Sequence, residues 1–153
     1  MVKKYVFGTP IETDAVVKEI KETSWKDDIF QKEGNVFHYL LKPDEIVYGL
    51  GENVRGMNKR GWRYVSNCSD NPNHCEHTNS LYGAHNFIMM GDGVSETYGL
   101  FVDTPGTVIF DVGYTDIDRL SIAMENENYK IYLIEGETYQ DVVREFREMI
   151  GRS

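Results

Sequence analysis

Short runs in which apolar and polar residues alternate follow one another along most of the chain. This period of two is typical of half-buried β-strands. Glycine, proline, asparagine and aspartate separate the runs, for example at residues 91–93 and 104–106. The runs cover residues 29–41 (divided at Gly34), 46–51, 63–67, 86–93, 96–103, 107–114, 119–126 and 129–136. Strands of this length and spacing predict an all-β fold, an antiparallel β-sandwich.

Two further elements are predicted near the N-terminus. Residues 1–10 predict a strand that ends at Pro10. Residues 13–25 predict a helix, because apolar side chains recur there at helical spacing after a polar start, although valine and isoleucine also suit a strand. The apolar side chains concerned are Val16, Val17 and Ile20.

A C-terminal helix is predicted within residues 137–153, where the apolar pattern changes to a helical period. Thr138 is the predicted N-cap, and Asp141 occupies the position where a capping box prefers Glu or Gln. Gly151 suits the C-terminal cap. The apolar stripe consists of Val142, Val143, Phe146, Met149 and Ile150. An isolated helix of about 12 residues is marginal in water, so this stripe needs a surface to pack against.

Length and charge exclude several classes of function. The 153 residues fit one domain, and the net charge of -9, without a dense run of lysine or arginine, disfavours nucleic acid and anionic membranes as partners. No run approaches the ~18 apolar residues of a membrane span, and the first residues do not resemble a secretory signal. We therefore expect a cytoplasmic protein with a neutral ligand. If the chain is a piece of a longer protein, however, its first residues say little about export.

The most unusual composition lies in residues 67–87, which hold both cysteines and three of the four histidines. The residues of zinc-ligand type in this segment are Cys68, His74, Cys75 and His77. Their spacing matches no common structural zinc pattern, and adjacent ligands in an extended chain tend to point apart. A disulfide between Cys68 and Cys75 is disfavoured in the cytoplasm. We expect no metal and no cofactor, and we favour a polar surface loop.

Elsewhere the residues show no catalytic constellation. The glycine-rich run 48–56 has Val54 where a dinucleotide site needs its third glycine, and it lacks the Lys-Ser or Lys-Thr of a P-loop. Glycine at alternate strand positions more often allows another part of the protein to approach closely. His38 is expected to be a strand residue with a satisfied ring. The acidic pairs at 27–28, 44–45 and 116 and 118 are expected on solvated turns.

Six sequence segments follow one another in a specific order. They are IVYGLGE (46–52), MNKRGWRYVSN (57–67), SLYGAHNFIM (80–89), YGLFVDTPG (98–106), FDVGY (110–114) and IYLIEGETYQDVVREF (131–146). This series resembles the N-terminal domain of family 31 glycoside hydrolases, the family of α-glucosidases and α-xylosidases. The resemblance covers residues 36–153 well and the first 35 loosely, and it looks strongest toward bacterial α-glucosidases.

The resemblance implies a galactose-mutarotase-like β-sandwich that packs on a (β/α)8 barrel. In that family the barrel carries an aspartate nucleophile and an aspartate acid/base, and the reaction hydrolyses terminal α-glucosides with retention of configuration. Nothing in this chain matches the W-x-D-M-N-E type of nucleophile motif. Residues 1–153 are therefore expected to be a single N-terminal domain excised from a larger enzyme and inactive alone. The implied partners are the barrel of the same polypeptide and an α-glucoside or oligosaccharide substrate.

The resemblance also implies a role for the polar segment. In the family, a long loop from the sandwich reaches over the barrel mouth and supplies an aspartate near the leaving-group side of the substrate. By order, this aspartate is Asp70, and Asn71 and His74 add hydrogen-bond donors and acceptors. A carboxylate suits sugar hydroxyls, because charge-assisted hydrogen bonds are roughly twice as strong as neutral ones. The alternative is that Asp70 caps the turn before Pro72.

Two other functions stay open at this point. A free-standing carbohydrate-binding module would present aromatic rings to sugar, with Trp25, Trp62 and Tyr82 as candidates. A small metal-binding or interaction protein would be built around residues 68–77.

Overall fold

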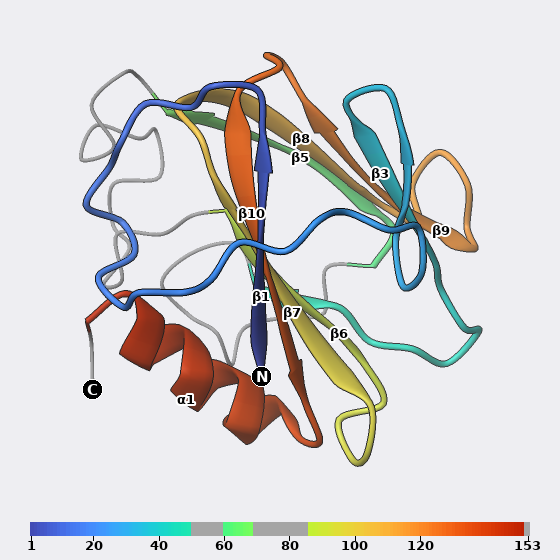
Figure 1. The fold of residues 1–153 in the computed structure, drawn as a ribbon. Coiled ribbons are helices and arrows are strands. Elements are labelled where there is room, and N and C mark those ends of the chain that lie inside the picture. Colours follow the sequence, from blue (N-terminus) through green and yellow to red (C-terminus); the bar gives the residue numbers. More distant parts are fainter. Residues whose placement is uncertain (50–59, 69–85, 152–153) are drawn as a thin grey trace.

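Two antiparallel sheets of five strands form most of the structure (Figure 1). The computed structural model describes residues 1–49, 60–68 and 86–151. Sheet A has the strand order β1-β10-β7-β6-β4, and sheet B has the order β2-β3-β9-β8-β5. The strands are β1 (Val2–Phe7), β2 (Gln31–Glu33), β3 (Val36–Leu40), β4 (Tyr48–Gly49), β5 (Trp62–Cys68), β6 (Phe87–Gly91), β7 (Thr97–Asp103), β8 (Gly106–Val112), β9 (Arg119–Met124) and β10 (Tyr129–Gly136). The predicted all-β sandwich is confirmed.

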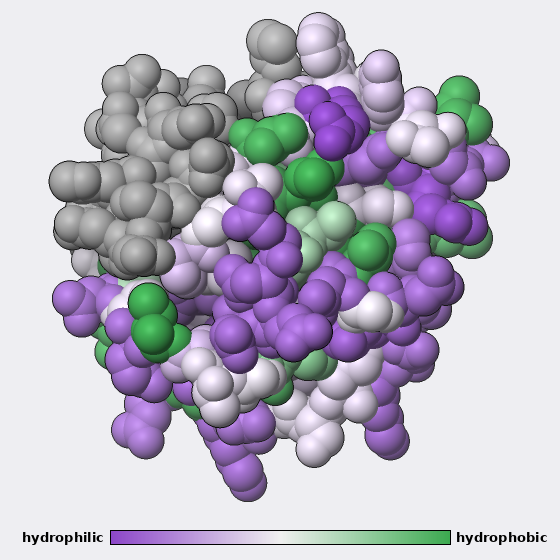
Figure 2. Space-filling model, turned by 90° about the horizontal axis from the view of Figure 1, so that it is seen from above, coloured by the Kyte–Doolittle hydropathy of each residue, from purple (hydrophilic) through white to green (hydrophobic). Residues whose placement is uncertain are grey.

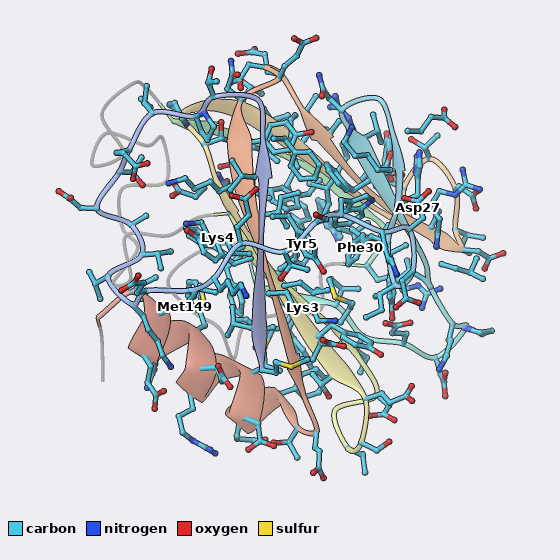
Figure 3. All side chains as sticks on the ribbon, in the orientation of Figure 1. Lys3, Lys4, Tyr5, Asp27, Phe30 and Met149 are labelled. Atoms are coloured by element: carbon cyan, nitrogen blue, oxygen red, sulfur yellow. The ribbon has the colours of Figure 1, made fainter. Side chains whose placement is uncertain are left out.

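The larger hydrophobic core fills the space between the sheets. Strand alternation places Leu100 and Val102 of β7 in this core, while Phe101 between them points to the opposite face of sheet A. Tyr5 of β1 and Phe30, before β2, also lie in the core (Figure 3). Each fully buried side chain of this size contributes roughly 1.5–3 kcal/mol. The alternation of apolar and polar residues in the sequence therefore arises because one face of each sheet is buried against the other sheet.

Helix α1 (Tyr139–Met149) covers part of the outer face of sheet A. Thr138 is its N-cap, as predicted, and the side chains of Thr138 and Asp141 complete a reciprocal capping box, although Asp stands where such a box prefers Glu or Gln. The ring of Phe146 stacks on Phe87 of β6 at 3.8 Å. Gly99 of β7 permits this packing, because a Cβ there would lie 2.6 Å from a methyl of Val142. No helix in the described ranges is long and apolar enough to cross a membrane.

The N-terminal segment that follows β1 covers another part of this outer face, and the helix predicted for residues 13–25 is wrong. The segment is irregular apart from one bridge between Glu22 and Lys4. Val16 and Ile20 pack against the outer core, and the Val17 N–H donates to Met149 O at 2.8 Å. Backbone groups that a helix would use internally thus bond to other elements, and β-branched residues lower helix propensity.

A buried polar contact fastens this segment to the sheet. Thr13 Oγ1 lies 2.8 and 3.0 Å from the two carboxylate oxygens of Asp103, at the end of β7. The ammonium of Lys130, opposite Asp103 in the ladder, lies 3.3 Å from Glu12. Burial raises the pKa of the Asp103 carboxyl, although the Thr13 hydrogen bond and the Lys130 charge oppose this shift.

A second buried polar contact joins the two sheets. Glu45 is buried, so its prediction on a solvated turn is wrong. One of its oxygens accepts from the Tyr39 hydroxyl of β3 at 2.5 Å and from the Gly91 N–H of β6 at 2.7 Å, and the other accepts from the Lys42 N–H at 3.0 Å. Burial is the largest cause that raises the pKa of the Tyr39 hydroxyl, and the hydrogen bond to Glu45 is the second largest. The carboxylate thus ties sheet B to sheet A through charge-assisted hydrogen bonds.

Substitution Tyr39→Phe tests this link. It removes one donor from buried Glu45 without opening a large cavity, so we expect a loss of about 1–2 kcal/mol in the free energy of unfolding. The control Tyr114→Phe alters a side chain that is 64% exposed and should change this energy by less than about 0.5 kcal/mol. Urea unfolding followed by circular dichroism measures both. Equal effects of the two substitutions would contradict a stabilising link.

Substitution Asp103→Asn tests the contact at the N-terminal segment. Since the folded-state pKa of Asp103 is raised, the folded protein binds its proton more tightly than the unfolded chain does. Ionisation above the unfolded pKa of about 3.9 therefore costs stability. As the pH rises from there, the wild type should lose free energy of unfolding relative to the Asn variant, until the folded-state pKa is passed. Parallel stability curves from pH 3.5 to pH 7, measured by urea unfolding, would refute this.

Candidate functional site

The three predicted substrate-binding residues, Asp70, Asn71 and His74, lie outside the described residues. The same holds for Cys75, His77 and Tyr82. What the structure describes is the pair of strands that flank the segment 69–85. Strand β5 of sheet B ends at Cys68, and strand β6 of sheet A begins at Phe87. The segment therefore connects the two sheets.

A buried hydrogen-bonded group, which we name the loop base, joins the two flanking strands. It consists of Ser66, Asn86 and the backbone of Val102 in β7. The Ser66 hydroxyl donates to Asn86 Oδ1 at 2.5 Å, and the Asn86 amide donates to Val102 O at 3.2 Å. The Val102 N–H donates in turn to Asn86 O at 3.0 Å. Both polar side chains are buried and satisfied, so Ser66 and Asn86 are held together on either side of the undescribed segment.

Sequence reasoning missed the loop base, although a signal exists. In the alternating pattern of β5, Ser66 occupies the same face as Tyr64, which packs against the core. A small polar residue at an inward position of a strand needs a hydrogen-bond partner. Its partner is distant in sequence, so the pattern of β5 alone does not reveal Asn86.

Gly49, the one glycine of the run 48–56 that the structure describes, has the packing role expected of it. A Cβ on Gly49 of β4 would lie 2.5 Å from Phe87 O, and the residue has a φ of 129°. Strand β4 thus approaches the first residue of β6 more closely than a side chain would allow. The predicted strand over 46–51 is paired only at Tyr48–Gly49 among the described residues.

The other sequence candidates divide into packed and exposed residues. His38 Nδ1 lies 2.9 Å from Ser121 Oγ, so its ring is satisfied as expected. The Trp25 ring packs edge-to-face on Tyr5, and its Nε1 donates to Asp27, which removes it as a platform for sugar. Trp62 is 61% exposed at the start of β5.

The carboxylates with shifted pKa values have structural explanations. Three backbone N–H groups, of Ser95, Val94 and Glu96, donate to Asp92 and hold the pKa of its carboxyl well below the usual range. Burial would raise the pKa of Asp111, but hydrogen bonds from the turn that follows β8 outweigh it and lower the pKa. Such groups stay ionised near neutral pH and cannot act as general acids. Within residues 1–49, 60–68 and 86–151, no cluster of three or more His, Cys, Asp or Glu side chains is arranged to hold a metal.

Comparison with known proteins identifies relatives of the chain. Residues 8–111 match the family described as the glycosyl hydrolase 31 N-terminal galactose mutarotase-like domain. An α-glucosidase of Saccharolobus solfataricus is 30% identical over 124 residues, which cover 79% of this chain and 18% of the relative. The α-xylosidase XylQ of Lactiplantibacillus pentosus is 30% identical over 110 residues, which cover 71% of this chain and 13% of the relative. The chain thus spans less than a fifth of the length of these two relatives.

Solved structures share the fold. A family 31 dextranase of Flavobacterium johnsoniae aligns with a TM-score of 0.55 at 22% identity and covers 82% of this chain and 15% of its own. A cycloalternan-degrading enzyme of Trueperella pyogenes aligns with a TM-score of 0.56 at 22% identity and covers 76% of this chain and 17% of its own. The sequence resemblance read from the six segments is confirmed by the family match, which extends over more than half of the chain. The chain belongs to the family of glycosyl hydrolase 31 N-terminal galactose mutarotase-like domains.

Proposed function

We propose that this chain is the accessory N-terminal domain of a retaining α-glucosidase and supplies a substrate-contacting loop to the active site of an adjoining (β/α)8 barrel. The proposal rests on how much of each chain the α-glucosidase match covers. The aligned residues are 79% of this chain but only 18% of the relative. The remaining four-fifths of such a relative leave ample room for a catalytic domain.

The proposed reaction needs a pair of carboxyl groups in a defined geometry. Retaining hydrolysis uses two carboxyls about 5–5.5 Å apart, one that attacks the anomeric carbon and one that protonates the leaving oxygen. Among the described residues, Asp92 and Asp111 accept hydrogen bonds from turns, Glu45 is buried between the sheets, and Asp103 contacts Thr13. These engagements support a domain that positions substrate while the barrel performs the chemistry.

The loop base supports a positioning role for Asp70. This residue follows Cys68, the last residue of β5, by two positions, so its Cα lies at most ~7 Å beyond the strand end. The strand near its end is held in place, because Ser66 bonds to Asn86, the residue before β6 of sheet A. A carboxylate delivered from a fixed strand end can accept hydrogen bonds from sugar hydroxyls, and Asn71 and His74 follow it within the same segment.

A carbohydrate-binding module remains the second candidate, and the exposure of Trp62 favours it. The Trp62 ring lies 6.4 Å from that of Tyr64 at an angle of 31°, and because Tyr64 packs against the core, Trp62 is the ring of this pair that is open to solvent. Binding of maltose or isomaltose to this chain, lost in Trp62→Ala, would favour the module. The accessory domain, which forms only one side of the pocket, should bind neither sugar detectably in calorimetry.

We predict that this chain alone does not hydrolyse p-nitrophenyl α-glucoside. The reason is that Glu45, Asp92, Asp103 and Asp111, among the described carboxylates, serve turns and packing contacts rather than catalysis. Release of p-nitrophenol, followed by absorbance, should not exceed that of a heat-denatured sample. Turnover above that background would show that catalytic carboxylates lie within the 153 residues.

In the polypeptide expressed from its complete reading frame, Asp70→Ala should lower kcat/KM for isomaltose roughly 10- to 100-fold. This is the loss expected for one charge-assisted hydrogen bond of about 1.5–3 kcal/mol. The melting temperature should not change, because the substitution leaves the loop base intact. The control Asp14→Ala removes a carboxylate that is exposed on the N-terminal segment and should leave kcat/KM unchanged. Identical kinetics for the two variants would remove Asp70 from the site.

A further inference from the structure

Strand β5 lies at the edge of sheet B, and among the described strands its backbone pairs with β8 alone. This ladder fixes the place of β5 within sheet B, but it does not fix the distance from β5 to sheet A. Contacts between side chains of the two sheets set that distance. The loop base provides such a contact, because the Ser66 hydroxyl of β5 donates to Asn86 Oδ1, and Asn86 immediately precedes β6 of sheet A.

Asn86 is in turn held by the middle strand of sheet A. Its side-chain amide donates to Val102 O, and its backbone carbonyl accepts from the Val102 N–H. Val102 belongs to β7, which is paired with β10 on one side and with β6 on the other. Central strands of a core are the parts of a protein that open least readily. The bond from Ser66 therefore connects the end of an edge strand to the best supported strand of the opposite sheet.

Two polar side chains at these buried positions indicate a role in positioning rather than in stability. Ser66 faces the core, and its partner in the ladder, Val108, is fully buried. Replacing both partners of a buried hydrogen bond by apolar groups of the same shape can be nearly neutral for stability. A satisfied polar pair adds a defined separation and direction, which make the local structure rigid. Ser66 and Asn86 are thus suited to fix where the end of β5 lies.

Neither side chain is placed to contact a ligand directly. Ser66 is 3% exposed and Asn86 is 4% exposed. Both lie at the end of the sandwich where β1 and β7 end, which faces the viewer in Figure 2. Hydrophilic side chains predominate over apolar ones on the described surface in that view, and the two residues lie beneath it. Any influence on a ligand therefore has to act through the residues that follow β5.

We propose that Ser66 and Asn86 are positioning residues that determine how well the whole polypeptide recognises a leaving sugar. The inference rests on the proposed function, in which Asp70 contacts the substrate near its leaving-group side. Asp70 follows Ser66 by four residues, so the two Cα atoms are at most ~14 Å apart. A shift of the β5 end displaces the Asp70 carboxylate, and a misplacement of about 1 Å can cost on the order of 100-fold in rate. Loss of the bond between Ser66 and Asn86 should therefore weaken recognition of the leaving sugar and spare the chemistry of the barrel.

The test compares two substrates in the polypeptide expressed from its complete reading frame. Isomaltose has a sugar as its leaving group, whereas α-glucosyl fluoride releases fluoride and offers no hydroxyl on that side. Ser66→Ala should lower kcat/KM for isomaltose roughly 3- to 10-fold and change kcat/KM for α-glucosyl fluoride by less than about twofold. The ratio of the two values is the decisive measurement, because a smaller amount of folded enzyme lowers both values alike.

The matched control is Thr97→Val. It removes a buried hydroxyl that donates to Glu137 O at the opposite end of β7, so it loses a comparable hydrogen bond far from the loop base. The control should leave the ratio unchanged. A parallel loss on both substrates in Ser66→Ala would show a merely structural role and overturn the inference. If circular dichroism shows that Ser66→Ala does not fold, Ser66→Cys replaces it, because a thiol fills the site but is a weak donor.

The kinetics of Asp70→Ala separate this inference from the proposed function. If Ser66 acts through Asp70, Ser66→Ala should not lower the ratio further in the Asp70→Ala background. A reduced ratio for Asp70→Ala together with a normal ratio for Ser66→Ala would overturn the positioning role alone. A normal ratio for Asp70→Ala would refute the substrate contact of the proposed function, and with it the route from Ser66 to the leaving sugar.

Discussion

The outer face of sheet A has to be covered, and the rest of the structure follows from this requirement. Strands β7 and β10 are apolar on both faces, so one face packs on sheet B and the other needs a second layer. The chain provides that layer from its two ends, as helix α1 and the N-terminal segment.

Buried polar contacts supplement the hydrophobic layers at specific places. Glu45 connects the sheets beside Tyr39, and the bond between Ser66 and Asn86 connects them where segment 69–85 leaves and returns. Removing one partner of a buried hydrogen bond costs more free energy than the bond contributes when it forms. Such contacts therefore determine which residues lie together more than they add to the free energy of unfolding. The loop base thus fixes the strand ends from which the predicted substrate-binding residues extend.

Local patterns predicted the strands and the terminal helix, because alternation and capping are encoded within a few residues. The N-cap Thr138 directly precedes the apolar stripe of the helix, so it can be read from the sequence. Residues 13–25 were misread because packing on sheet A and the bond from Val17 to Met149 decide their conformation. Glu45 was misplaced on a solvated turn for the same reason, since Gly91, one of its donors, is remote in sequence. Asp70, Asn71 and His74 remain predictions from resemblance.

The proposed division of labour assigns sugar cleavage to a neighbouring domain and substrate positioning to this one. The most direct test is a crystal structure of the polypeptide from its complete reading frame with isomaltose bound. This division predicts a (β/α)8 barrel in the same polypeptide and the Asp70 carboxylate within hydrogen-bond distance of a sugar hydroxyl. An Asp70 remote from the sugar, or a reading frame that encodes no barrel, would contradict it.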